Sequence, residues 1–207
     1  MTLEIFGPVQ SNFTWSVRMA AHEKGIDANH HVVMPHTPEL LAANPTGRAP
    51  GMRHGDVTIF ETSAILRYLD DAFEGPALIP TDTSEAIRLE QWISYNNTTL
   101  DIWLIRRYVL EFIFNAGDDG LPPAERIAEA VEKLPSVFKM VEQGFAQGFY
   151  GSDKFTIADC LVLPNLFYAQ KFPHSKEAFE ACPDLVAYFD RVKNRESLVA
   201  TMPPQAR

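Results

Sequence analysis

The feature that most constrains this chain is a change of pattern near residue 80. In residues 1–74, short apolar runs alternate with segments of helical periodicity, whereas beyond residue 84 the apolar residues recur at helical spacing. The segment between them, residues 74–83, is rich in Pro and Gly, as a linker should be. We therefore predict an α/β domain over residues 1–74 and an all-helical domain over residues 84–207.

The first half reads as a small mixed domain. Strands are predicted at residues 3–6, 30–34 and 57–60, with a short extended piece around Pro50. Helices are predicted at residues 13–24, ending at Gly25, and at residues 63–73. The predicted order is strand, helix, strand, irregular segment, two strands and a helix.

The second half reads as helices alone, over residues 84–115, 123–147, 156–170 and one or two short helices within 176–200. The start of the third is the best defined. Thr156 is a good N-cap, and Asp159 follows at the spacing of a capping box, with Phe155 and Cys160 placed to form a hydrophobic staple. We expect Asp159 to be structural rather than catalytic.

Composition and charge exclude several classes of function. The net charge of −9, with scattered basic residues, argues against a nucleic-acid partner. No stretch approaches the ~20 apolar residues of a membrane helix, and the first residues do not read as a signal peptide, so a cytoplasmic location is expected. Cys160 and Cys182 lack metal-ligand spacing and read as buried packing thiols, and no metal site is predicted.

Three motifs together resemble the signature of the cytosolic glutathione transferases. They are Asn44-Pro-Thr-Gly-Arg-Ala-Pro50 followed by Glu61-Thr-Ser-Ala-Ile-Leu-Arg-Tyr-Leu69, then Phe-Thr-Ile-Ala-Asp at 155–159, and Ala-Cys-Pro-Asp-Leu-Val-Ala-Tyr at 181–188. The resemblance implies a thioredoxin-like N-terminal domain, an all-α C-terminal domain and a homodimer that uses glutathione as co-substrate. The chain departs from the signature at Thr62, where Ser is usual, and at Ala49, where a larger residue is common.

Ser11 is the candidate thiol-activating residue. It lies in the turn after the first predicted strand, and the segment from Ser11 to Arg18 resembles the serine-type members, closest to zeta- and theta-like bacterial ones. A hydroxyl hydrogen bond and the positive end of a helix both stabilise a thiolate. Two alternatives stay open: Ser11 only caps the helix, or Thr14 supplies the hydroxyl. The tyrosine of the tyrosine-type classes is missing, since Phe6 ends the strand.

The remaining glutathione contacts follow from the resemblance and from ligand chemistry. A cis Ala49–Pro50 bond would turn the Ala49 main chain toward the cysteinyl backbone of glutathione. Glu61 suits the γ-glutamyl ammonium, and Thr62, at a helix start, suits the γ-glutamyl carboxylate. Arg48 is placed to reach the glycyl carboxylate. In a homodimer, Asp101 of the partner subunit would approach the ammonium.

The electrophile pocket is expected along the first long helix of the second domain, at Trp103, Tyr108 and Phe112, although an aromatic stripe is more often core. The predicted function is a glutathione S-transferase that adds the thiolate to an electrophilic small molecule. The alternatives are a glutathione-dependent isomerase or reductase, and a non-enzymatic interaction module with the same fold.

Overall fold

The computed structural model describes residues 2–204, which form two compact units. Unit 1 comprises residues 2–81 together with residues 193–204, and unit 2 comprises residues 82–192. The division therefore differs from the predicted domains in its last segment, which groups with the α/β unit rather than with the helices.

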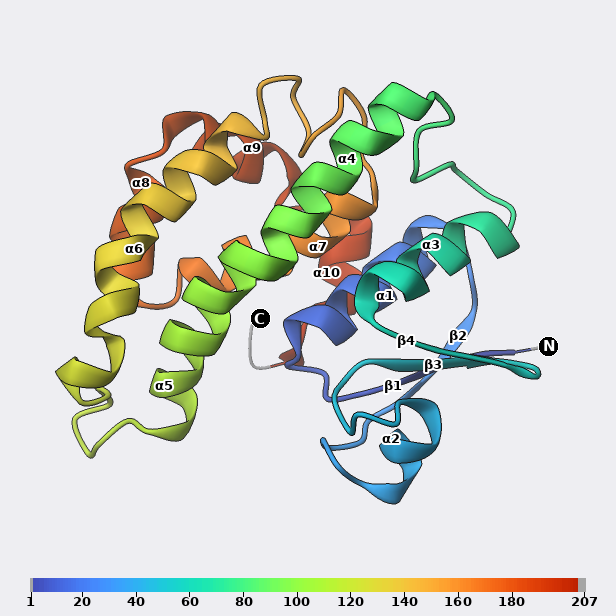
Figure 1. Ribbon diagram of the computed structural model, residues 1–207, viewed down its shortest axis with the longest axis horizontal. Helices are drawn as coiled ribbons and strands as arrows, with labels where there is room; N and C mark the ends of the chain where they lie inside the picture. Colours follow the sequence, from blue (N-terminus) through green and yellow to red (C-terminus); the bar gives the residue numbers. More distant parts are fainter. Residues whose placement is uncertain (1, 205–207) are drawn as a thin grey trace. The chain divides into compact units, whose positions relative to one another are not determined.

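A four-stranded mixed sheet forms the centre of unit 1 (Figure 1). Its strands are β1 (Leu3–Phe6), β2 (Ala28–His31), β3 (Gly51–His54) and β4 (Val57–Phe60), in the order β2-β1-β3-β4. β1 pairs with β2 in parallel, and the other two pairings are antiparallel. This arrangement confirms the thioredoxin-like sheet expected for the first half.

Helices cover both faces of this sheet. Figure 1 shows α1 (Asn12–Glu23) and α3 (Thr62–Ala72) on one side and α2 (Pro38–Ala43) on the other. The alternation of β1 produces these two layers, because Phe6 packs against Leu40 and Ala43 of α2 while Leu3 and Ile5 are buried on the opposite face.

Three predicted elements of unit 1 need correction. The second strand covers residues 28–31 rather than 30–34, because its partner β1 ends at Phe6, which pairs with His31. Val32 and Met34 beyond it are more than half exposed. The extended piece near Pro50 continues into β3, and the irregular segment contains α2, which Thr37 caps by accepting from the Leu40 N–H.

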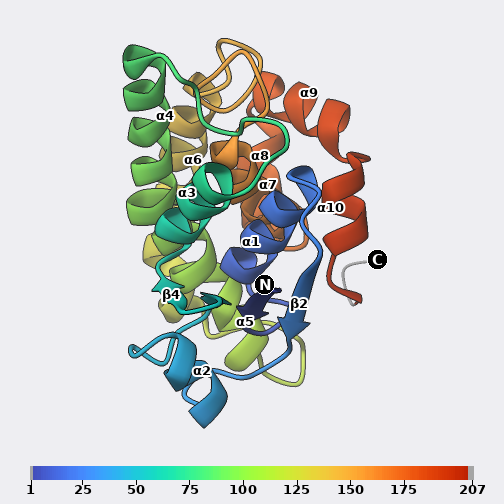
Figure 2. The same cartoon turned by 90° about the vertical axis from the view of Figure 1, so that its right-hand side faces the viewer.

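The C-terminal segment packs against α1 through α10 (Glu196–Thr201), and Figure 2 shows α10 beside α1. The Trp15 indole donates to the Thr201 hydroxyl at 2.9 Å. Arg195 makes a two-pronged ion pair with Glu23, at 2.6 and 2.7 Å. These bonds explain why residues 193–204 belong to unit 1.

Unit 2 is helical, as predicted. It contains α4 (Thr83–Tyr95), a π-helix η1 (Asn96–Val109), α5 (Leu110–Phe114), α6 (Ala124–Gln143), α7 (Ile157–Ala169), α8 (Pro173–Glu180) and α9 (Pro183–Val192). The first three follow one another without a break, matching the long helix predicted at 84–115, although its π-helical part was not foreseen. The segment 176–200 holds parts of three helices rather than one or two.

The predicted capping box at α7 is present and wholly buried. The Asp159 Oδ2 accepts from the Thr156 N–H at 2.8 Å and from the Thr156 hydroxyl at 3.1 Å, while that hydroxyl accepts from the Ala158 N–H. Oδ1 accepts from the Tyr188 hydroxyl at 2.6 Å and from the Tyr150 N–H at 3.1 Å. One carboxylate thus ties α7, α9 and the preceding loop together, which supports its predicted structural role.

Candidate functional site

Three chain segments converge at one end of the sheet of unit 1. Phe6 of β1 pairs with Gly51 of β3, and Gly51 pairs with Phe60 of β4, so these residues form one row across the sheet. One residue beyond the row lie Gly7, Pro50 and Glu61. The turn before α1, the loop before β3 and the start of α3 therefore meet here.

Gly7 shows how closely the first two segments approach. A Cβ built on Gly7 would lie 2.3 Å from the Thr14 Oγ1 and 3.0 Å from the Ala49 Cβ. Its φ of 155° also lies in the range that favours glycine. Only a residue without a side chain lets α1 and the Ala49 loop pack against the end of β1.

Ser11 is the N-cap of α1 and is half-buried. Its Oγ accepts from the Thr14 N–H at 3.3 Å, and among the described residues nothing accepts its own hydroxyl proton. A cap that accepts with its lone pair keeps this proton to donate. The capping alternative is therefore true of Ser11, and it is compatible with a second bond to a thiolate at the positive end of α1.

Thr14, the competing hydroxyl, is fully buried against Gly7. Its Oγ1 has no hydrogen-bond partner among the residues that the structure describes, and it is closed off from solvent. The Thr14 hydroxyl is therefore enclosed, whereas Ser11 lies at a half-buried position.

The loop before β3 is organised by Asn44. Its side-chain amide donates to the carbonyls of Arg48, at 2.6 Å, and Pro50, at 3.1 Å, and its oxygen accepts from the Thr46 N–H and hydroxyl. The Ala49–Pro50 bond is cis, as expected. The Ala49 N–H and C=O make no hydrogen bond within the described chain, and the Arg48 side chain is exposed.

Glu61 and Thr62 begin α3. Glu61 adopts φ 69° and ψ 118°, a strained conformation for a residue with a side chain, which holds its exposed carboxylate outside the helix. Thr62 is the first helical residue and is 6% exposed. As the first helical residue, its N–H lies among those without an intrahelical partner, a place that suits a carboxylate.

The three predicted pocket aromatics lie in unit 2, with different surroundings. Tyr108 is fully buried, and its hydroxyl accepts from the His174 N–H at 3.0 Å, which makes it a core residue. Phe112 packs on Phe172 with ring centroids 4.7 Å apart. Trp103 is half-buried under the Arg107 guanidinium, 5.0 Å from its ring centroid.

The other candidate side chains are buried. Asp101 is buried and paired with Arg106, at 2.8 and 3.3 Å. Cys160 and Cys182 are buried and form no disulfide within the described residues, and burial raises the pKa of the Cys182 thiol. In the part of the chain that the structure describes, no group of three or more His, Cys, Asp or Glu residues could hold a metal ion, and no helix is long and apolar enough to cross a membrane.

The sequence did not reveal two of these features. Asn44 belongs to the motif at 44–50, but its spacing does not indicate that its side-chain amide donates hydrogen bonds to two carbonyls. The positive φ of Glu61 is likewise invisible, because Gly and Asn are the residues that usually signal it.

Comparison with known proteins assigns the family. The model of the glutathione S-transferase N-terminal domain matches residues 10–72, and that of the C-terminal domain matches residues 103–196. A probable glutathione S-transferase of rice, GSTF1, is 29% identical over 98% of both chains. Glutathione S-transferase F10 of Arabidopsis thaliana is 30% identical over 76% of this chain and 74% of its own.

Solved structures agree. Glutathione S-transferase III in apo form superposes with a TM-score of 0.75 at 27% identity, covering 99% of both chains. The fold, the two domain matches and these relatives show that this chain belongs to the glutathione S-transferase family.

Proposed function

We propose that this chain is a glutathione S-transferase in which Ser11 activates the glutathione thiol for attack on an electrophilic small molecule. The observation that carries the proposal is the hydroxyl proton of Ser11, which no described residue accepts. It lies at the start of α1, at the sheet end where the Ala49 loop and the start of α3 also lie. The bound thiol loses its proton to solvent, and the thiolate sulfur then bonds to an electrophilic carbon. The displaced electron pair departs with a leaving group or, in an addition, moves onto the conjugated activating group, which takes up a proton.

The energies involved are adequate. A free thiol titrates near ~8.5, and lowering its pKa by about two units requires about 2.7 kcal/mol of thiolate stabilisation. A hydrogen bond to a charged group contributes about 1.5–3 kcal/mol, and a helix N-terminus adds about 0.3–1 kcal/mol. Ser11 and α1 together supply this amount without any metal.

The surrounding groups suit the rest of the tripeptide. The Ala49 N–H and C=O are free to pair with the cysteinyl backbone, and the N–H and hydroxyl of Thr62 suit the γ-glutamyl carboxylate. Glu61 then receives the ammonium, and Arg48 the glycyl carboxylate. Because Asp101 is held by Arg106 in its own subunit, the proposal does not depend on a residue of a partner subunit.

Two finer statements belong to this proposal. The serine-type assignment rests on Ser11, whereas a zeta- or theta-like bacterial subtype gains no support from the rice and Arabidopsis transferases named above. The homodimer and the cytoplasmic location remain predictions.

The non-enzymatic alternative is represented among the relatives. An elongation factor 1-gamma of Prunus avium is 30% identical to this chain, and the matched region covers 69% of this chain and 35% of the elongation factor. The retained Ser11, Glu61 and Thr62 favour an enzyme.

One experiment separates these functions. The protein is passed over immobilised glutathione, eluted with free glutathione and assayed for conjugation to a chloronitroarene. We expect retention and turnover, with turnover strongly reduced in Ser11→Ala while retention persists. Retention without turnover in the wild type would refute the transferase assignment in favour of a binding module.

A further inference from the structure

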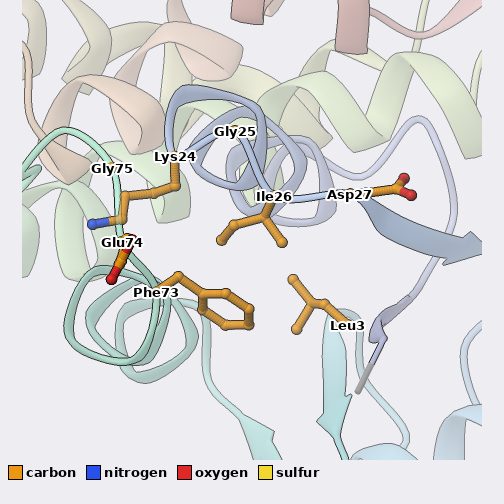
Figure 3. A pocket seen from close by; sticks show the side chains of 8 residues that line it. All are labelled: Leu3, Lys24, Gly25, Ile26, Asp27, Phe73, Glu74 and Gly75. Atoms are coloured by element: carbon orange, nitrogen blue, oxygen red, sulfur yellow. The ribbon is translucent and has the colours of Figure 1, made fainter.

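A pocket of about 460 Å³ opens in unit 1 at the opposite end of β1 from Ser11. Its lining comes from the start of β1, the turn after α1 and the end of α3, and consists of Leu3, Lys24, Gly25, Ile26, Asp27, Phe73, Glu74 and Gly75 (Figure 3). All eight residues belong to unit 1. None of them takes part in the proposed transferase site.

The floor of this pocket is apolar. In Figure 3 the side chains of Leu3, Ile26 and Phe73 point toward one another around the open space. The Phe73 ring is supported from behind by His54, 4.8 Å away between centroids, and His54 is bonded to the Tyr68 hydroxyl at 2.9 Å. This backing fixes the aromatic wall, so the pocket offers a preformed surface to an apolar body.

The charges around the floor favour one sign of ligand. Lys24 is the only basic residue in the lining. Its side chain is 3% exposed, and its ammonium donates to the Asp70 carboxylate at 3.0 Å and to the Asp70 carbonyl at 3.1 Å. Within residues 2–204, the exposed carboxylates of Glu74 and Asp27 have no such partner. Glu74 lies on the Lys24 side, while Asp27 stands at the rim with its carboxylate directed away from the apolar side chains (Figure 3).

The helix dipoles also favour a positively charged ligand. α1 ends at Glu23 and α3 ends at Ala72, so the negative ends of both helix dipoles lie beside the pocket. An aromatic face such as that of Phe73 also attracts a cation. An anion such as glutathione meets repulsion here.

We propose that this pocket binds a small amphipathic cation, an ammonium group carried on an aromatic or branched apolar body. The apolar body lies on Leu3, Ile26 and Phe73, and the ammonium faces Glu74 and the two helix ends. This is a second ligand site, independent of the transferase function proposed above.

The test uses three probes of matched shape: 2-phenylethylammonium, 2-phenylethanol and phenylacetate. Each is titrated into the full chain while the backbone amide NMR signals of Gly25, Ile26 and Phe73–Gly75 are followed. The cation should shift these signals saturably and bind at least about fivefold more tightly than the alcohol, the combined size of a cation–π contact and a helix-end contribution. Phenylacetate should bind most weakly.

Two exposed carboxylates provide matched variants. Glu74→Gln should weaken the ammonium probe at least about threefold, and Asp71→Asn, the same charge change on α3 outside the lining, should leave it nearly unchanged. Ser11→Ala should also leave it unchanged, which separates this site from the transferase site. Equal binding of all three probes, equal effects of the two charge variants, or no shift of these amides would overturn the proposal.

Discussion

Both α1 and α7 begin with a hydroxyl N-cap, Ser11 and Thr156, but the two hydroxyls differ in the hydrogen bonds that they make within the protein. At α7 the Thr156 hydroxyl accepts from a backbone N–H and also donates to Asp159, so both of its hydrogen-bonding capacities are used inside the protein. At α1 the Ser11 hydroxyl accepts from the Thr14 N–H, but no carboxylate follows at the capping-box position, which Thr14 occupies. We call the Thr156 arrangement a closed cap, because its hydroxyl donates to a protein carboxylate, and the Ser11 arrangement an open cap. The closed cap stabilises the fold, whereas the open cap leaves a hydroxyl donor for a ligand.

Breaking the closed cap should have the largest effect. Asp159→Ala removes the acceptor of four buried donors, and leaving buried polar groups unpaired should cost about 3–5 kcal/mol in the free energy of unfolding. Chemical denaturation measures this loss, and the turnover of the remaining folded fraction should be close to that of the wild type. A variant that unfolds normally but turns over a hundredfold more slowly would contradict the structural role.

The closed cap should also carry a pH signature. Burial raises the pKa of Asp159 from 3.8 to about 6, because its desolvation outweighs the hydrogen bonds that favour the ionised form. A folded-state pKa above the unfolded value makes this group's contribution to stability fall as pH rises from about 4 to about 6, by up to about 3 kcal/mol.

Asp159→Asn cannot ionise and serves as the reference for this effect. The free energy of unfolding of the wild type minus that of the variant should decrease across this pH range and level off above it. A difference that increases with pH would mean that hydrogen bonding, rather than burial, controls the carboxyl.

Removing the open cap should affect chemistry before stability. Ser11→Ala should lower kcat/KM by about 10²-fold, the usual loss for one donor to a reacting anion, while the affinity for glutathione stays within a few-fold. Its unfolding free energy should fall by only about 1 kcal/mol, because the cap bond is long and half-exposed. Steady-state kinetics and denaturation on the same preparation measure both values. Loss of stability without loss of turnover would make Ser11 a cap alone.

The start of α3 offers a third helix end to compare. Thr62→Val removes the hydroxyl with little change in volume and should weaken glutathione binding by about 1.5 kcal/mol. Calorimetry detects this change, and Thr58→Val on the exposed strand β4 is the matched control. Equal affinities in the two variants would remove Thr62 from the γ-glutamyl site.

The smallest effect concerns the strained residue before α3. Glu61→Gly should be about 1 kcal/mol more stable than Glu61→Ala, because glycine adopts the observed φ of 69° without a side-chain clash. Both variants lose the same carboxylate and should bind glutathione equally weakly. An alanine variant as stable as the glycine variant would show that this backbone carries no strain.

Much of the architecture could be predicted because local signals agreed with it. The strands at Leu3–Phe6 and Val57–Phe60 and the capping box at Thr156 each follow from residue pattern alone. The end of β2 could not be read from its own residues, since the length of β1 sets it. The placement of residues 193–204 depends on long-range bonds such as that between Trp15 and Thr201, which no local pattern contains.

The candidate site was also predictable only in part. The sequence favoured Ser11 and kept Thr14 as the alternative hydroxyl, but it could not show that Thr14 is the one buried against Gly7. The pocket prediction for Tyr108 rested on a helical stripe of aromatics, and a stripe does not say that the hydroxyl is bonded to the His174 N–H in the core.

The most direct test of the open-cap account is the thiol pKa of bound glutathione, measured by ultraviolet absorbance of the thiolate in the wild type, Ser11→Ala and Thr14→Val. We expect a pKa about two units below that of the free thiol in the wild type, a return toward the free value in Ser11→Ala, and no change in Thr14→Val. An unchanged pKa in Ser11→Ala, or a rise confined to Thr14→Val, would contradict it.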